Sequence, residues 1–78
     1  MKTADDRFKK LKWLKIENDN FINYEKYYQE TKCTVFILFD KDEKQIEVST
    51  TDKNIIPVIN TELHISIHLK MIELGWLF

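Results

Sequence analysis

The segment from Thr34 to Phe39 constrains the fold of this chain more than any other. Its sequence, TVFILF, consists almost entirely of β-branched and aromatic residues, a composition typical of a β-strand. The charged stretch Asp40–Lys44 follows as a turn, and residues 45–50 then alternate between apolar and polar side chains. This pattern predicts a β-hairpin over residues 34–50.

The turn chemistry also predicts the register of this hairpin. With the turn centred on residues 42–43, Phe39 lies opposite Ile46 and Ile37 lies opposite Val48. One face of the hairpin is then apolar and consists of Val35, Ile37, Phe39, Ile46 and Val48.

A second hairpin is predicted before the first. Leu14–Glu17 alternates as a short strand, Asn18–Asn20 contains turn-forming residues, and the aromatic-rich segment Phe21–Tyr28 forms the next strand. Ile22, Tyr24 and Tyr28 share one face of the predicted sheet. The opposite face carries Phe21, Tyr27, Phe36 and Leu38.

The chain is expected to begin with a helix. Thr3 caps its N-terminus, Asp6 completes a capping box, and the helix ends near Leu11 or Lys12. The tetrapeptide that follows, Leu11-Lys12-Trp13-Leu14, resembles Leu74-Gly75-Trp76-Leu77 near the other end of the chain. Both are predicted to be helix exits with a tryptophan that folds back.

A second helix is predicted over Glu62–Leu74. The segment also alternates as a strand would, but its length, the capping residues at positions 60 and 61, and Gly75 at its end favour a helix. Gly75 supplies a left-handed C-terminal cap, and Trp76 folds back onto Met71.

The expected fold is a single α+β domain covering residues 1–78. Its order is α-β-β-β-β-α, a four-stranded antiparallel β-meander with an N-terminal and a C-terminal helix. Ile55–Ile59, interrupted by Pro57, is expected to form an edge strand or a buried connector. The side chains expected on the solvent side of the last helix are Ser66, Lys70 and Glu73.

The composition excludes several classes of function. One glycine in 78 residues leaves no glycine-rich phosphate loop. A net charge of −1, from 12 basic and 13 acidic residues, does not indicate a globally basic nucleic-acid-binding protein. The single cysteine, Cys33, forms no internal disulfide, and without a secretory signal or a membrane span the expected location is the cytoplasm. No enzyme, cofactor or small-molecule substrate is indicated.

Several motifs resemble a loose class of small phage and prophage proteins of low-GC bacteria. The matching positions are Phe8–Leu11, Lys15–Asp19, Ile22–Tyr24, Phe39-Asp40, Glu62-Leu63, Ile67, Met71 and Glu73–Trp76. Members of this class often carry glycine at the position of Lys12. The resemblance implies a terminal helix and a phage- or prophage-encoded accessory protein, and it brings no catalytic residues.

The expected role is non-catalytic protein binding, either by self-association as a homodimer or to a host protein. The resemblance extends this role to inhibition of a host defence or replication protein. The aromatic and apolar side chains exceed what one small core can hold, which indicates an interface if both helices cover the same face of the sheet. If the helices pack on opposite faces instead, no such apolar patch is left. The candidate interface residues are Phe21, Tyr27, Phe36, Leu38, Trp13 and Trp76.

Nucleic-acid binding is an alternative hypothesis. Residues 1–15 carry six basic and two acidic side chains. Basic residues beside an aromatic ring can contact phosphates and stack a base. The residues in question are Lys9, Lys10, Lys12, Lys15 and Trp13. A solvated helix face with Trp13 in the core is the other interpretation.

A metal site is a second alternative. His64 and His68 have the spacing of two histidine ligands on one helix face, and Cys33 or an acidic residue would have to supply a third ligand. Ordinary histidines at the boundary of a helix face are the other interpretation.

Overall fold

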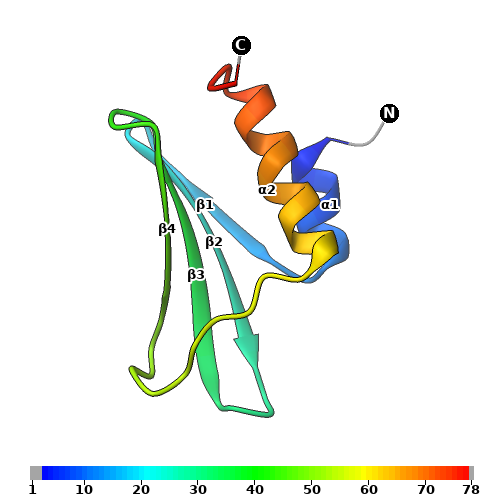
Figure 1. Ribbon diagram of the computed structural model, residues 1–78, viewed down its shortest axis with the longest axis vertical. Helices are drawn as coiled ribbons and strands as arrows, with labels where there is room; N and C mark the ends of the chain where they lie inside the picture. The colour runs from blue at the N-terminus through cyan, green and yellow to red at the C-terminus, as the bar shows by residue number, and fades with distance from the viewer. Residues whose placement is uncertain (1–2, 78) are drawn as a thin grey trace. The chain divides into compact units, whose positions relative to one another are not determined.

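The computed structural model describes residues 3–77. Its elements follow the predicted order (Figure 1): α1 (Ala4–Lys10), β1 (Leu14–Glu17), β2 (Phe21–Tyr28), β3 (Cys33–Asp40), β4 (Gln45–Thr50) and α2 (Thr61–Glu73). The α+β class, the meander and the helical state of the last segment are confirmed. No helix in the described part of the chain is long and apolar enough to cross a bilayer.

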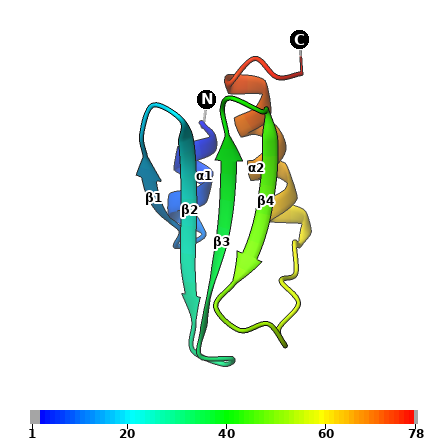
Figure 2. The same cartoon turned by 90° about the vertical axis from the view of Figure 1, so that its left-hand side faces the viewer.

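The chain divides into two compact units. A helical unit comprises the chain up to Trp13 and from Val58 onward, and a sheet unit comprises Leu14–Pro57. The four antiparallel strands of the sheet unit lie side by side in the order β1-β2-β3-β4 (Figure 2).

The predicted register of the β3–β4 hairpin is confirmed. Phe39 pairs with Ile46, and Ile37 pairs with Val48. In the β2–β3 pairing, Ile22 lies opposite Phe39. One face of the sheet, the inner face, is therefore apolar across its central strands.

The inner face is deeply buried at β2 and β3. Its buried side chains are Ile22, Tyr24, Cys33, Val35, Ile37 and Phe39. The rings of Tyr24 and Phe39 meet edge to face, with centroids 5.7 Å apart, a favoured aromatic geometry. This alternation of buried and half-buried residues along β3 follows from its period of two.

The two longer hairpins close through four-residue loops that end in a lysine. Residues 29–32 join β2 to β3, and residues 41–44 join β3 to β4. Lys32 has φ 53° and Lys44 has φ 55°, so both lie in the left-handed region, where glycine is usual. A chain with one glycine uses lysine at these positions.

The helix starts follow the predicted capping. The Thr3 side chain accepts a hydrogen bond from the Asp6 amide at 3.2 Å, and the Asp6 carboxylate accepts one from the Thr3 amide at 3.1 Å. This is the predicted capping box of α1. At the start of α2, the Asn60 side chain accepts a hydrogen bond from the Leu63 amide at 2.9 Å.

The C-terminus of α2 is a Schellman motif, as Gly75 predicted. The Gly75 amide donates to the Ile72 carbonyl, and the Trp76 amide donates to the Met71 carbonyl, each at 3.0 Å. These are the two hydrogen bonds that define the motif, and Gly75 has φ 75°.

The C-terminus of α1 has the same motif with a lysine in place of the glycine. The Lys12 amide donates to the Lys9 carbonyl at 3.0 Å, and the Trp13 amide donates to the Phe8 carbonyl at 2.9 Å. Lys12 has φ 72°. The predicted equivalence of the two helix exits is therefore confirmed in the backbone.

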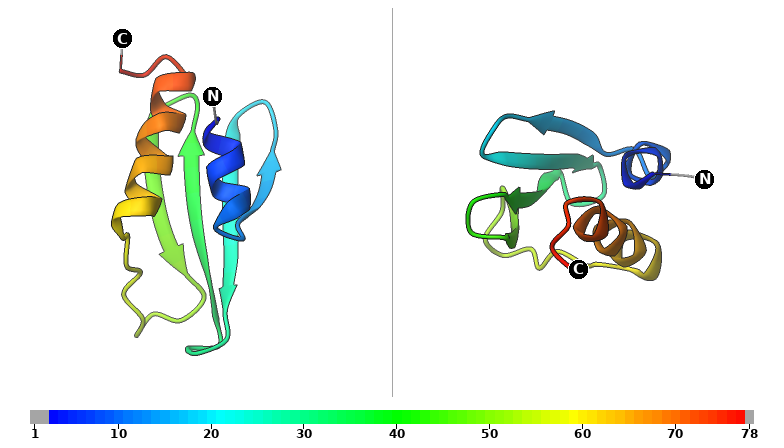
Figure 3. Two further views of the ribbon diagram at one scale, coloured as in Figure 1. Left: turned by 90° about the vertical axis from the view of Figure 1, so that its right-hand side faces the viewer. Right: turned by 90° about the horizontal axis from the view of Figure 1, so that it is seen from above.

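The solvent side of α2 differs from the prediction. Ser66 is fully buried and Lys70 is 6% exposed, whereas Ile65 and Ile72 are 39% and 51% exposed. The placement of Ser66 and Lys70 in solvent was wrong, while Glu73 is exposed as expected. Within the helical unit, α1 and α2 lie side by side (Figure 3), and polar contacts between them hold Lys70 inside.

Those contacts join the N-terminal turn of α1 to the last turn of α2. Lys70 Nζ lies 3.3 Å from the Asp5 carboxylate and 3.7 Å from that of Glu73. Glu73 also accepts a hydrogen bond from the Ala4 amide at 2.7 Å. Ser66 donates its hydroxyl proton to the Glu62 carbonyl at 3.0 Å. Each buried polar group named here thus has a partner, which makes its burial tolerable.

The predicted edge strand or buried connector at residues 55–59 is wrong. This segment has no regular structure, and Ile56 and Val58 are 84% and 79% exposed. Pro57 has no amide proton to donate to a neighbouring strand, which disfavours pairing here. The boundary between the two compact units follows this residue.

Candidate protein-binding face of the sheet

The face opposite the inner face, the outer face, is built from two central cross-strand rows. In strand order, the first row is Leu14, Glu25, Phe36 and Ser49. The second row is Ile16, Asn23, Leu38 and Glu47. Phe21 and Tyr27 lie on the same face of β2, because they are even numbers of residues from Asn23.

The structure thus brings four predicted interface residues onto one face and adds two more. Phe21, Phe36 and Leu38 are half-buried and Tyr27 is 56% exposed. Leu14 and Ile16 were missed, although they are 60% and 46% exposed. The sequence does show that both residues alternate with charged residues in β1 and so share one face of that strand. The pairing of β1 with β2 was needed to show that this is the outer face of the sheet.

The charged strand residues of the outer face are all acidic. They are Glu25, Asp40 and Glu47. Asp40 is engaged locally, because its carboxylate accepts hydrogen bonds from the Asp42 and Glu43 amides at 3.0 and 3.1 Å. Within residues 3–77, the side-chain carboxylates of Glu25 and Glu47 have no hydrogen-bond or ion-pair partner.

The basic strand residues lie on the inner face instead. Lys15 and Lys26 alternate with the outer-face residues of β1 and β2. Lys15 lies 3.1 Å from the Glu17 carboxylate, and Lys41 lies 2.9 Å from it. The hydrogen bond from Lys41, with a smaller contribution from Lys15, lowers the pKa of Glu17 below its ordinary value.

Tyr28 is the other group with a shifted pKa. Burial raises the pKa of this phenol, and the nearby Cys33 and Glu30 add to the effect. The Lys26 ammonium lies 5.0 Å from the centre of the Tyr28 ring, in a cation–π arrangement. These groups lie at the end of the β2–β3 hairpin, away from the strand rows that form the outer face.

The two tryptophans lie in the helical unit. Trp13 is 6% exposed, and its ring meets that of Phe8 edge-on with centroids 6.3 Å apart. Its buried ring is therefore not presented to a partner protein or to a nucleobase. Trp76 is half-buried beyond the end of α2.

The basic residues proposed for nucleic-acid binding are all exposed, but the structure gives them no stacking ring. They are Lys9, Lys10, Lys12 and Lys15. Lys15 is already paired with Glu17. Because Trp13 is buried, these lysines could contact phosphates by charge, but base stacking on Trp13 is not available.

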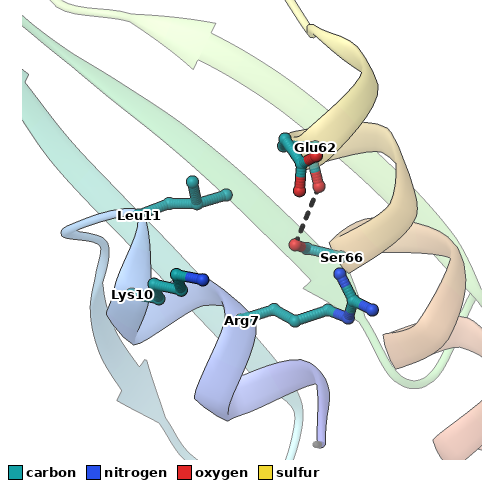
Figure 4. A pocket seen from close by; sticks show the side chains of 5 residues that line it. All are labelled: Arg7, Lys10, Leu11, Glu62 and Ser66. Carbon is teal, nitrogen blue, oxygen red and sulfur yellow. Dashed lines mark hydrogen bonds between the residues drawn. The ribbon is translucent and has the colours of Figure 1, made fainter.

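A hollow of about 450 Å³ lies between the two helices (Figure 4). Its lining comprises Arg7, Lys10, Leu11, Glu62 and Ser66. The Arg7 Nε is buried and has no hydrogen-bond partner among the described residues. A carboxylate lies in the same hollow as the two cations, which weakens any attraction for an anion. The Ser66 hydroxyl donates its proton to the Glu62 carbonyl.

The two histidines lie together on the exposed side of α2. Their rings are stacked, with centroids 6.4 Å apart and an angle of 20° between planes. A zinc site needs a third protein ligand. Over residues 3–77, no three histidine, cysteine or acidic side chains gather in a way that could hold a metal ion. His64 and His68 share this side with the exposed Ile65 and Ile72.

Comparisons with known proteins add no relative to these observations. A scan against models of protein families found no match, and searches of curated proteins and of solved structures found none.

Proposed function

We propose that this protein acts by binding another protein through the outer face of its sheet. The observation that supports this proposal is the gathering of six apolar side chains on that face, with Leu14, Ile16 and Tyr27 about half exposed. Apolar patches of this kind on small proteins commonly mark interaction sites. Burying the exposed half of each of these three side chains would contribute about 1 kcal/mol per residue.

The proposed role is non-catalytic. A sheet face offers contact area and rigid anchors, and aromatic residues such as Tyr27 and Phe36 supply large contact surfaces at low entropic cost. The resemblance to phage and prophage proteins supports an accessory role in a bacterial cytoplasm. In that setting, binding a host defence or replication protein would inhibit it by occupying its surface.

Site-specific photo-crosslinking tests the proposal. A benzoylphenylalanine is introduced at Tyr27 or at Ile16 in cells that naturally make the protein, and the control position is Lys53, which is exposed in the loop after β4. We expect discrete protein adducts from the two outer-face positions and none from Lys53. Equal adducts from all three positions, or none from the outer face, would contradict the proposal.

A further inference from the structure

We infer that the partner of the outer face presents lysine or arginine side chains around an apolar centre, and that it is not a second copy of this chain. This inference rests on the proposed function of the same face. The charges on that face all have one sign, because its strand residues carry three carboxylates and no cation.

Glu25 is the carboxylate that a partner of this face must cover. This half-buried residue lies in the middle of the face, between Leu14 on one neighbouring strand and Phe36 on the other. A partner that covers these two apolar side chains must also remove the Glu25 carboxylate from water. Desolvating a carboxylate is costly unless the partner supplies a cation or hydrogen-bond donors.

The position of Glu47 fixes the distance between the two unpaired carboxylates of this face. Glu47 lies two strands from Glu25 and one cross-strand row away. With strands about 4.8 Å apart and a rise of about 3.4 Å per residue, their Cα atoms are about 12 Å apart. Phe36 and Leu38 lie on the strand between them. A matching partner therefore has an apolar centre flanked by two cationic groups.

The outer face of a second copy of this chain does not provide these cationic groups. In a two-fold symmetric dimer the same patch faces itself, so the outer faces of both copies would meet. The carboxylates of Glu25 and Glu47 would then lie in one interface with carboxylates of the other copy. Like charges brought together in an interface disfavour that pairing.

The test selects binders from a random 16-residue peptide library displayed on yeast, with the full chain as the target. We expect the enriched peptides to combine apolar residues with lysine or arginine and to have a net positive charge. Glu25→Gln and Glu47→Gln should each weaken binding of a selected peptide by about two- to fivefold at low salt, less at high salt. Glu43→Gln, an exposed carboxylate in the β3–β4 loop, is the matched control and should leave binding unchanged.

The outcomes separate this inference from the proposed function. The inference is overturned if the selected peptides bind Leu14→Gln or Ile16→Gln more weakly than the wild type but are not enriched in lysine or arginine. The proposal that this face binds proteins would then still stand. If no peptide is enriched, or if Leu14→Gln and Ile16→Gln both bind the selected peptides as tightly as the wild type does, protein binding by this face fails as well. Sedimentation of the pure chain as a dimer that Leu14→Gln dissociates would show that a second copy is the occupant and would also overturn the inference. Circular dichroism of each variant confirms that it folds.

Discussion

Replacing Lys12 by glycine should stabilise this protein. Lys12 occupies the first position after the α1 C-cap with φ 72°, and Gly75 occupies the equivalent position of α2 with φ 75°. The hydrogen bonds of the two Schellman motifs are the same, so a glycine at position 12 has a native precedent within the chain. The Lys12 side chain is exposed and makes no hydrogen bond or ion pair to the part of the chain that the structure describes.

The magnitude follows from the backbone alone. A residue with a β-carbon in the left-handed region costs about 1–2 kcal/mol, which glycine avoids. Glycine loses more conformational entropy on folding, and this offsets about 0.5–1 kcal/mol of the gain. We therefore expect Lys12→Gly to raise the free energy of unfolding by about 0.5–1 kcal/mol. In a domain of this size, that corresponds to an increase in Tm of about 2–8 °C.

Urea and thermal unfolding followed by circular dichroism measure this change. Lys12→Ala removes the same charge but keeps the β-carbon in the left-handed region, so it should leave the stability close to that of the wild type. Lys9→Gly, at an exposed position within α1, should lose about 0.5–1 kcal/mol. If Lys12→Gly is no more stable than Lys12→Ala, the backbone at position 12 is not strained and the reasoning is refuted.

Three further predictions concern the second helix exit, a surface carboxylate and the two faces of the sheet. Gly75→Ala should lower the free energy of unfolding by about 1 kcal/mol in the same urea assay, purely through the backbone, because an added β-carbon meets nothing within 4 Å. Glu17→Gln should cost less than about 1 kcal/mol at neutral pH, since the carboxylate is exposed. Because Lys41 lowers the pKa of Glu17 in the folded protein, this difference from the wild type is present above the ordinary pKa of 4.5. It should vanish as the pH falls through the lowered value, which unfolding at several pH values would check. Ile37→Ala on the inner face should cost about 2–5 kcal/mol, whereas Ile16→Gln on the outer face should stay within about 0.5 kcal/mol. Equal losses from these two variants would show that the outer face is part of the core.

The sheet was predictable because its information is local. The alternation in β3 and β4 and the central turn were enough to pair Phe39 with Ile46, as the structure confirms. The helix exits were equally local, since a single glycine followed by Trp76 marks a Schellman motif. The match between Lys12 and Gly75 was visible in the sequence because each residue follows a leucine and precedes the dipeptide Trp-Leu.

The orientation of α2 was not predictable in this way. Its apolar residues spread over a broad arc, so periodicity alone cannot choose which side is buried. The choice is made by Lys70, whose ammonium meets Asp5 from a distant part of the chain, and by Ser66, whose hydroxyl is satisfied inside its own helix. These partners turn polar residues inward and leave Ile65 and Ile72 outside.

The outer face was predictable only in its centre. The alternation within β2 and β3 assigns Phe36 and Tyr27 to one side of the sheet. The β1–β2 pairing that adds Leu14 and Ile16 is a non-local contact, and the four-residue strand has too short a pattern to indicate its side. The sign of the charge on that face depends on the same pairing, because it separates Glu25 from Lys15.

Cys33 allows transient opening of the β2–β3 hairpin to be measured by thiol labelling. It is the single thiol of the chain, it is 1% exposed, and its sulfur lies 3.1 Å from the Thr31 hydroxyl beside the β2–β3 loop. A thiol reagent can therefore modify the native chain only when this end of the hairpin separates transiently. The labelling rate, measured by mass spectrometry as one mass increment per molecule, reports the free energy of that local opening without any engineered residue.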